Sequence, residues 1–587
     1  MLFNIMHRAA LGAKYSIFRE QQKLLHELKI KGTVFVHYKD LFDPELIRGV
    51  KEDADVYGDE IGLALHDMTG PGLDSIVGNL PAFWLFSLEN KKKILETILA
   101  KYKEVFGVHP KSIASYHFDS SSLRILKEQC PECETIVGGC FEEGVRVFHG
   151  CNHSWYLFNE GMPWGPWFPS KEHSLRPATS EVDSAGFVAV PHLVRDMSLS
   201  YEGRNDFWAS HPPNVVRGMG NEASFNPYDL NLIDQYRMQE KINGRPAYLN
   251  TFVGVNWLTW NHNSEYPPEV CWQLYRTMLE YLVELRDSGE AMDMTLSEYG
   301  QWHRKNRTYA EPEVYHSKEL LYGSGKHYFW YLDGAQRLLI DPTQGGSIGD
   351  LRSYAGRCRV ETGPDSKHRE IGSYPYLIQS QHRTGFAHHH EDGSRTSVFL
   401  ECDGEQIDFA SIRTKVDEVT REGGSTRLQL TPARFQFANG ISGELITSFH
   451  WDANTGVTQI ERKIQNLSDP DQTLTLIEHF KGAPGKTEYA EDLSDIVLLV
   501  NEDDTTAVNY DYAGRYIDFK AATQVTARIP QVNTAVHLVA CSPHSTEAGI
   551  KCGNLFSPFL TLQLKYQLQG NETVQTEMRI EQLDSSK

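Results

Sequence analysis

Carboxylates follow several predicted strand ends, where they could act as acid and base in a hydrolysis. Four residues hold such positions: Asp119, Glu142, Asp196 and Glu298. In glycoside hydrolysis one carboxyl group protonates the leaving oxygen, and a second acts as nucleophile or base. Asp119 is the preferred nucleophile or base, because the hydroxyls at 120–122 could orient an ionised carboxylate. The alternative is that Asp119 caps the helix that begins at Ser120.

Histidines and aromatic rings accompany these carboxylates. The polar side chains that we expect to bind substrate are His7, His66, Asp67, His117, Glu172, His173 and His192. The aromatic side chains that we expect to bind it are Trp155, Trp164, Trp167, Trp257 and Trp260. Flat apolar rings beside carboxylates and amides suit a sugar ring, which presents both C–H patches and hydroxyls. The alternative is that these rings pack on one another inside their loops.

β-rich runs and amphipathic helical stretches alternate over roughly the first 300 residues. The predicted strands are 2–8, 32–38, 60–68, 112–118, 135–141, 187–194 and 247–255, and a last segment covers 294–303. Such alternation implies parallel strands joined by right-handed crossovers. It predicts a (β/α) barrel of seven or eight units, closed or nearly closed, with a doubly wound open sheet as the alternative. The active site of such a barrel lies at the C-terminal ends of its strands, where Arg8 and His37 also fall.

The composition changes after about residue 310. Short alternating runs are separated by turn dipeptides such as Asp333-Gly334 and Asn439-Gly440, which is typical of antiparallel strands. The fold class expected is therefore α/β plus all-β. We predict a catalytic barrel over 1–305, a linker over 306–326 and a large antiparallel β-sandwich over 327–587.

Charge and hydropathy limit the partners. The 57 Lys and Arg against 78 Asp and Glu give a formal net charge of −21, which repels phosphate backbones and argues against nucleic acid. No apolar run is long enough for a transmembrane span, so no membrane partner is expected. The first residues do not match a leader pattern, so a cytoplasmic location is expected. The expected partner is an oligosaccharide or glycoside, and the sequence leaves homo-oligomer formation open.

The nine cysteines are thinly spread and odd in number, which argues against a disulfide framework. One group contains a CxxC pair and consists of Cys130, Cys133, Cys140 and Cys151, followed by His153. A CxxC pair could begin a structural zinc site. The spacing to the next two cysteines matches no zinc-finger pattern, however, so reduced and mostly buried thiols are the preferred interpretation.

Several segments resemble the glycoside hydrolase/deacetylase (β/α)-barrel superfamily, namely GTVFVHY, GDEIGLALHDM, VPHLVRD and MTLSEYGQW. That superfamily includes polysaccharide deacetylases and the hydrolases related to α-mannosidases and family 57 amylases. A barrel followed by a sandwich is similar to α-mannosidase-like hydrolases. It is also similar to an uncharacterised two-domain family of glycan-degrading bacteria, a likeness that the stretch PSKEHSLRPA shares. The resemblance covers about residues 1–305 and the sandwich after them, and it implies a carbohydrate-active enzyme.

The chain departs from this superfamily at its metal ligands. The deacetylase pattern has an Asp pair at the first strand, and FNIMHRAALG has none. After the third strand His66 is present without a second His, and Ala64 stands where relatives often have one. The His-x-His-x-Asp signature of α-mannosidases is also missing. We therefore expect a glycoside hydrolase with two carboxylates and no cofactor.

Two alternatives to that hydrolase stay open. The first is a metal-dependent polysaccharide deacetylase with a divalent ion near His66, using also His7, Asp67 and His117. The second is a non-catalytic carbohydrate-binding protein.

Overall fold

The computed structural model of the chain divides into two compact units. The first holds Met1–Tyr309 and Lys318–Ser324, and the second holds Ala310–Ser317 and most of the chain after Gly325. The structure describes residues 1–78, 83–115, 118–138, 161–192, 197–198, 228–259, 268–320, 323–354, 374, 376–380, 394–483, 493–542, 545–554 and 557–583.

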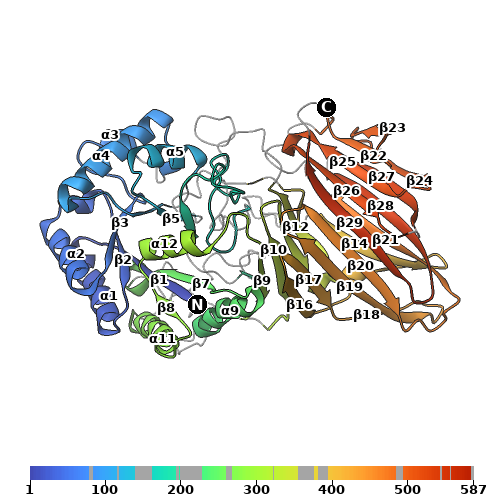
Figure 1. The fold of residues 1–587 in the computed structure, drawn as a ribbon, viewed down its shortest axis with the longest axis horizontal. Coiled ribbons are helices and arrows are strands. Elements are labelled where there is room, and N and C mark those ends of the chain that lie inside the picture. The colour runs from blue at the N-terminus through green and yellow to red at the C-terminus, as the bar shows by residue number, and fades with distance from the viewer. Residues whose placement is uncertain are drawn as a thin grey trace. The chain divides into compact units, whose positions relative to one another are not determined.

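A parallel sheet of eight strands forms the centre of the first unit (Figure 1). Its strand order is β6-β5-β4-β3-β2-β1-β7, and β8 pairs with β1. The strands are β1 (Leu2–Arg8), β2 (Gly32–Val36), β3 (Glu60–Ala64), β4 (Ser112–Ala114), β5 (Thr135–Gly138), β6 (Val188–Pro191), β7 (Tyr248–Phe252) and β8 (Met292–Asp293). Most of their residues are buried, because a parallel sheet is covered on both faces.

Helices connect these strands, as the alternating pattern predicts. The α-helices are α1 (Tyr15–Glu27), α2 (Pro44–Tyr57), α3 (Asp74–Val77), α4 (Leu88–Phe106), α5 (Ser120–Gln129), α9 (Tyr228–Asn243), α10 (Asn256–Thr259), α11 (Pro268–Asp287) and α12 (Leu296–Asn306). Short 3-10 turns cover Gly12–Lys14, Lys39–Phe42 and Phe83–Leu85 in this unit. Asp43 begins α2 by accepting hydrogen bonds from the amides of Glu45 and Leu46, and Gly58 ends it with φ 79°. In the described part of the chain no helix has the length and apolar character to cross a membrane.

The parallel β/α organisation is confirmed, but the prediction of a closed barrel is wrong. Among the described residues β6 and β7 are the two edges of the sheet and do not pair with each other. The side-chain amide of Asn250 in β7 donates to the carbonyl of Pro191 in β6, so a side chain spans the seam in place of a strand ladder. Pro191 ends β6 and has no amide hydrogen to donate to a ladder.

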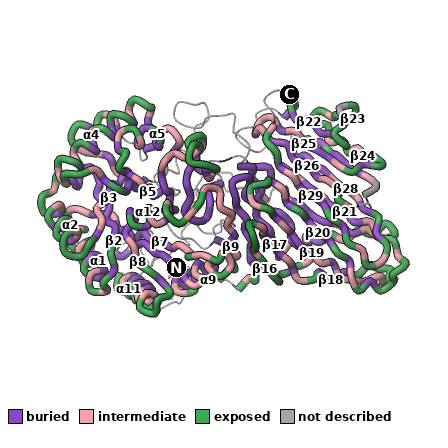
Figure 2. The backbone as a smooth tube through the Cα atoms, viewed as in Figure 1, coloured by how far each residue is buried: buried purple, intermediate pink, exposed green. Residues whose placement is uncertain are grey.

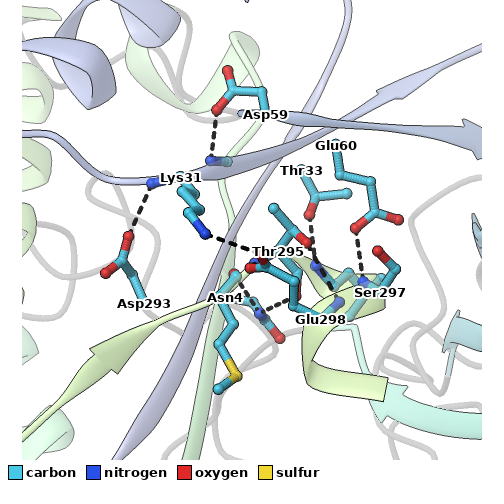
Figure 3. Close-up of polar contacts among 12 residues, drawn as sticks. Asn4, Lys31, Thr33, Asp59, Glu60, Asp293, Thr295, Ser297 and Glu298 are labelled. Carbon is cyan, nitrogen blue, oxygen red and sulfur yellow. Dashed lines mark hydrogen bonds and ion pairs between the residues drawn. The ribbon is translucent and has the colours of Figure 1, made fainter. Parts of the chain in front are cut away.

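Helix α12 crosses the N-terminal ends of the strands (Figure 3). The Leu296 amide donates to the Thr33 hydroxyl at the start of β2, at 2.9 Å. The Ser297 amide donates to the Glu60 carboxylate at the start of β3, at 2.7 Å. One turn from the end of the helix, Arg304 donates to the two carbonyls that lie just before β5 and β6. The helix therefore covers the edge of the sheet that is opposite to the expected active site.

Gly300 lies at the closest approach of α12 to the sheet, since a Cβ there would lie 1.9 Å from the Thr135 hydroxyl oxygen. We expect Gly300→Ala to lower the free energy of unfolding of the first unit by about 1–3 kcal/mol, measured by thermal unfolding. Thr135→Ala in the same chain should restore most of the loss, and Gln301→Ala at the exposed neighbouring position should change little. Equal unfolding temperatures for Gly300→Ala and the wild type would contradict this packing.

The second unit consists of antiparallel strands in three sheets, with orders β13-β12-β11-β10-β9, β15-β14-β21-β28-β27-β24 and β16-β17-β19-β20-β29-β26-β25-β22-β23, and β18 pairs with β19. The strands are β9 (Glu313–Lys318), β10 (His327–Leu332), β11 (Gln336–Asp341), β12 (Ser347–Ser353), β13 (Ile378–Gln379), β14 (Arg395–Cys402), β15 (Glu405–Asp408), β16 (Val416–Glu422), β17 (Ser425–Leu430), β18 (Ala433–Gln436), β19 (Ser442–Asp452), β20 (Val457–Gln465), β21 (Thr473–Gly482), β22 (Val497–Val500), β23 (Asp503–Asn509), β24 (Tyr516–Lys520), β25 (Gln524–Ile529), β26 (Thr534–Ala540), β27 (Ser545–Asn554), β28 (Ser557–Gln569) and β29 (Thr573–Gln582). Short 3-10 turns cover Pro342–Gln344, Phe409–Ser411 and Pro530–Val532.

The two larger sheets face each other across a buried layer. Buried and exposed residues alternate along strands such as β20, as Figure 2 shows. Buried Arg462 of β20 donates to buried Glu478 of β21 at 2.8 Å, which joins one sheet to the other. Strand β9 falls inside the stretch 306–326 that the sequence predicted as a linker. That part of the expected linker is therefore a strand of the second unit.

Candidate functional site

Four basic side chains stand at the C-terminal edge of the parallel sheet. Arg8 is the last residue of β1, His37 directly follows β2, His66 lies two residues after β3, and His192 directly follows β6. We call these four residues the mouth cluster. The C-terminal ends of parallel strands meet at one edge, so the fold brings residues that are far apart in sequence to the same place.

Three residues of the mouth cluster, Arg8, His66 and His192, surround one aromatic ring. The Nε2 atoms of His66 and His192 lie 3.2 Å apart, and both side chains are buried. Phe252 of β7 contacts both rings, with centroid distances of 5.8 Å to His66 and 4.5 Å to His192. The Arg8 guanidinium lies 5.8 Å from the centre of the same ring. Residues from β1, β3, β6 and β7 therefore form one contiguous group.

Electrostatics keeps His66 neutral. Burial, and then the positive charge of Arg8 and the neighbouring His192 and His37, lower the pKa of His66 well below its ordinary value. Because His66 is neutral, one of the two Nε2 atoms in this contact carries the proton and the other accepts it. Neutral His66 therefore takes part in hydrogen bonding without introducing a second charge beside Arg8.

His37 is oriented by a carboxylate. Asp40 accepts hydrogen bonds from the His37 ring nitrogen Nδ1 at 2.9 Å and from the His37 backbone amide at 2.7 Å. This contact holds the ring proton on Nδ1 and leaves Nε2 as a proton acceptor, as in the base of a catalytic triad. Both side chains are buried. His37 is therefore the described residue whose surroundings best suit a general base.

The mouth cluster does not fit a metal ion. Two imidazole nitrogens at 3.2 Å match neighbouring ligands on one zinc ion, which are roughly 3.3 Å apart at zinc–nitrogen bond lengths. However, within the described residues no third His, Cys, Asp or Glu ligand joins His66 and His192. The nearby Arg8 cation also opposes a divalent ion. We therefore derive no step through a metal here.

Asp119, the preferred catalytic carboxylate, takes part in a buried ion pair. Lys91 of α4 donates to its two oxygens at 3.1 and 2.9 Å, and the Ser121 hydroxyl and Ser122 amide donate at 2.8 Å each. Burial alone would raise the pKa of Asp119, but the Lys91 charge and these hydrogen bonds together hold it below its ordinary value. Asp119 is the N-cap of α5, which is the alternative that the sequence left open.

Asp67 lies beside His66 at the same edge of the sheet. Its side chain accepts hydrogen bonds from Lys39 and from the amide and hydroxyl of Thr69. Burial would raise the pKa of Asp67, but these contacts outweigh it and hold the pKa at about 2. Asp67 is therefore an ionised acceptor whose hydrogen bonds stabilise its own loop. It lies next to the mouth cluster, but its oxygens already have these partners.

Glu298 lies at the wrong end of the sheet for catalysis at the mouth. It is the third residue of α12, where its side chain and Thr295 form a reciprocal capping box. Its other oxygen accepts from the exposed Lys31 ammonium at 2.9 Å, one residue before β2 begins (Figure 3). A helix cap at the N-terminal edge explains this carboxylate. The sequence placed a strand where the chain forms this helix.

His7 faces away from the mouth. Its two ring nitrogens contact the Tyr275 hydroxyl of α11 and, at 2.9 Å, the Gln22 amide of α1. Burial, followed by the charge of His26, lowers the pKa of His7 to about 3. Successive side chains of a strand alternate between faces, so His7 packs against helices while Arg8 reaches the mouth cluster. His7 is thus a core residue.

Trp164 and Trp167 are sealed inside the first unit. They are 1% and 7% exposed, and the Trp167 indole donates to the Ser174 carbonyl at 3.0 Å. The cavity beside Trp167 has a volume of about 10 Å³, which is room for one water and not for a sugar ring. These two rings therefore pack inside the protein, which was the alternative to stacking on a sugar.

Glu172 and His173 also lie away from the mouth. Their segment runs antiparallel to β6, and the bridge between Ser170 and Ser184 lies before the N-terminal end of that strand. Glu172 forms an ion pair with Arg176 at 3.7 Å, and the His173 ring accepts from a nearby amide. The two residues belong to a self-contained turn near the N-terminal edge.

The remaining predicted residues cannot be placed in this site. Glu142, Asp196, His117, Trp155 and Trp260 lie outside the described residues. Trp257 is in helix α10, and its side chain is not among the described ones.

Two acidic residues were not predicted from the sequence. The first is Asp40, whose position three residues after His37 could have indicated the hydrogen bond. The second is Asp229 in the first turn of α9, which is 3% exposed and whose carboxyl oxygens have no hydrogen-bond partner within the part of the chain that the structure describes. Burial raises the pKa of Asp229 to about 8, so the side chain is mostly neutral at pH 7. Acidic residues are common in the first turn of a helix, so the position of Asp229 in the sequence did not indicate a buried carboxyl group.

Asp229 lies at the end of α9 that is nearer the mouth. Glu240, near the other end of the helix, forms an ion pair at 3.0 Å with the amino group of Met1, which precedes β1 at the N-terminal edge. The helix has 16 residues and so spans about 24 Å.

A polar hollow of about 240 Å³ lies on the ten-stranded sheet of the second unit. Its lining includes Arg427, His450, Gln459, Glu461 and Gln575. Arg427 and Glu461 lie 3.8 Å apart, and the Gln575 amide donates to Glu461 at 3.3 Å. Amide, carboxylate and guanidinium groups side by side can hydrogen-bond hydroxyl groups.

No protein-family model matches this sequence, and no curated protein matches it. A solved structure from Parabacteroides distasonis, described as a glycoside hydrolase/deacetylase, is similar at 15% identity and TM-score 0.44 over 62% of this chain and 88% of that one. A galactose mutarotase-like protein from Clostridium acetobutylicum is similar at 10% identity and TM-score 0.32 over 46% of this chain and 99% of that one. The 4-alpha-glucanotransferase of Thermococcus litoralis is similar at 10% identity and TM-score 0.28 over 99% of this chain and 100% of that one. These values are too low to place the chain in a family.

Proposed function

We propose that this chain is a carbohydrate-active hydrolase that works at the C-terminal edge of its parallel sheet. The observation that supports the proposal is the His37–Asp40 hydrogen bond at the edge of the sheet where Arg8, His66 and His192 also follow strand ends. The Nε2 of His37 would take a proton from water or from a substrate hydroxyl. The His66–His192 pair would hydrogen-bond sugar hydroxyls, and Arg8 would stabilise negative charge as it develops.

Glycoside hydrolysis is the first candidate reaction, as the sequence resemblance implies. Of its four proposed carboxylates, Asp119 and Glu298 have structural partners, and Glu142 and Asp196 are outside the described residues. The acid–base pair therefore consists, in this proposal, of His37 and one of those two carboxylates.

Hydrolysis of an acyl group on a sugar is the second candidate, and the His37–Asp40 contact with a nearby cation favours it. A histidine base and a positive charge suffice to activate water and to hold the oxyanion of an ester or amide. Release of acetate from acetylated sugars, against release of reducing sugar from glycosides, separates the two candidates.

His37→Gln is expected to lower kcat/KM by about a hundredfold or more on whichever substrate the wild type cleaves, because the general base is lost. Asp40→Asn should also lower kcat, with a smaller change in KM, since it removes orientation and not substrate contact. His66→Gln should raise KM, because its proposed role is hydrogen bonding to substrate. The measurement is steady-state kinetics on glycoside and acetylated-sugar panels.

Glu298→Gln is the matched control, since it removes a carboxylate at the opposite edge and should keep wild-type turnover. Wild-type turnover in His37→Gln would refute the proposal. Binding of sugars without any turnover by the wild type would also refute it and would favour the carbohydrate-binding alternative. In that case Arg427→Ala in the polar hollow should weaken binding, measured by calorimetry.

A further inference from the structure

Three potential metal ligands meet at the N-terminal edge of the sheet, away from the mouth cluster. His109 lies in the loop between α4 and β4, and Cys130 and Glu132 lie in the loop between α5 and β5. Strands β4 and β5 are parallel neighbours, so both loops arrive at the same edge. One ligand atom of each side chain lies within 4.8 Å of those of the other two.

The surroundings of these side chains leave donor atoms available. Among the described residues the buried His109 Nδ1 has no hydrogen-bond partner. The Cys130 thiol is fully buried, and it donates only a weak hydrogen bond of 3.6 Å to the Pro110 carbonyl, while the Cys133 backbone amide lies close enough to donate to its sulfur. Glu132 is exposed, so an ion can enter from solvent on its side. The unpartnered nitrogen is the second observation, beside the clustering itself, that indicates a ligand.

The kinds of donor atom select the ion. Calcium and magnesium take oxygen ligands, whereas one nitrogen, one sulfur and one oxygen together suit zinc. Zinc–ligand bonds of 2.0–2.3 Å put ligand atoms roughly 3.3–3.8 Å apart, so the ligand atoms need to approach one another by no more than about 1.0–1.5 Å. The Cys133 thiol donates to the Thr135 carbonyl at 3.6 Å and is not part of the group. Water would complete a tetrahedron.

We propose that His109, Cys130 and Glu132 bind one zinc ion that ties the α4–β4 loop to the α5–β5 loop. The site is independent of the proposed hydrolysis. The proposed site combines Cys130, the first cysteine of the CxxC pair, with His109, which precedes it in the chain. It differs from the zinc site considered in the sequence, which would combine the pair with later cysteines. On binding, the Cys130 sulfur exchanges its proton for the ion, and that proton passes to the buffer.

The test uses the full chain, stripped with a chelator and then titrated with Co²⁺ or Zn²⁺. We expect one equivalent of Co²⁺ with a tetrahedral visible spectrum and an ultraviolet thiolate-to-cobalt band. Zinc should raise the unfolding temperature and release about one proton per ion from Cys130. Cys130→Ser should abolish the thiolate band. His109→Gln should abolish the binding of one equivalent of Co²⁺. Glu132→Gln, at an exposed position, should weaken zinc binding by roughly tenfold.

Two controls make the result specific. Cys271→Ser changes another buried free thiol, in α11, and should leave the cobalt spectrum unchanged. The double variant His66→Gln with His192→Gln should also keep the band, which separates this site from the mouth cluster. A cobalt complex without a thiolate band, or binding that persists unchanged in His109→Gln and Glu132→Gln, would overturn the proposal. The His109 and Glu132 variants keep the test decisive if Cys130→Ser fails to fold.

Discussion

Replacing Lys91 by Met is expected to lower the free energy of unfolding of the first unit by about 3–5 kcal/mol, because it leaves the buried Asp119 carboxylate without its counter-ion. Lys91 is 0% exposed and Asp119 is 9% exposed, so water cannot replace the lost partner. The Lys91 ammonium also donates to the Ser121 hydroxyl at 2.7 Å, which the variant breaks. Thermal and denaturant unfolding of the first unit measure the effect.

The double variant Lys91→Met with Asp119→Asn is the control, because it removes both charges. It should recover part of the loss, since replacing a whole buried ion pair costs much less than breaking it. The pKa of Asp119 is held below its ordinary value, so its stabilisation is present above about pH 4 and is lost as the pH falls through its folded pKa. The difference between wild type and Lys91→Met should therefore shrink in acid. A difference that is small and independent of pH would contradict the ion pair.

Replacing Asp229 by Asn is expected to stabilise the first unit by about 4–6 kcal/mol at pH 8 and above. Burial raises the pKa of this carboxyl from 3.8 to about 8. Between these two values the unfolded chain loses the proton and the folded chain keeps it. Wild-type stability therefore falls by about 1.4 kcal/mol for each pH unit over that window. The neutral amide of Asn removes this penalty with nearly the same shape.

The measurement is unfolding at pH 4, 6 and 8, compared between wild type and Asp229→Asn. At pH 4 the folded carboxyl is protonated and the unfolded one is only about half ionised, so the two proteins should differ by less than about 1 kcal/mol and should separate as the pH rises. Asp55→Asn, at an exposed position on α2, serves as the control and should show no such separation. Parallel curves for wild type and Asp229→Asn would show that the carboxyl is paired or solvated.

The sequence predicted the strands of the first unit and the edge where polar groups gather, because apolar β-runs and helical periods are local features. The predicted strands also indicate the mouth cluster, since Arg8, His37, His66 and His192 all lie at or near the C-terminal end of a predicted strand. The sequence did not show which of two adjacent residues points toward the mouth cluster. His7 and Arg8 are adjacent, and only the register of β1 against its helices shows that His7 packs outward.

The errors concern side chains whose partners are far away in sequence. Asp119 had two local explanations, as cap and as base, and the buried Lys91 that decides for the cap lies 28 residues earlier. Glu298 was predicted to lie at a strand end in the segment from 294 to 303, although Thr295 and Glu298 have the spacing of a capping box. Trp164 and Trp167 had the composition of a binding surface, but burial is a tertiary property.

The position of α12 at the N-terminal ends of β2, β3, β5 and β6 sets an order for folding during synthesis. Until about residue 300 has left the ribosome, the hydroxyl of Thr33 and the carboxylate of Glu60 lack the amides that pair with them. At about 5–20 residues per second, β2 and β3 lack these hydrogen bonds from α12 for tens of seconds or less after they are synthesised. A chain halted when only residues up to about 290 have left the ribosome should therefore remain sensitive to protease along this edge, whereas one halted after about residue 310 has left the ribosome should resist it.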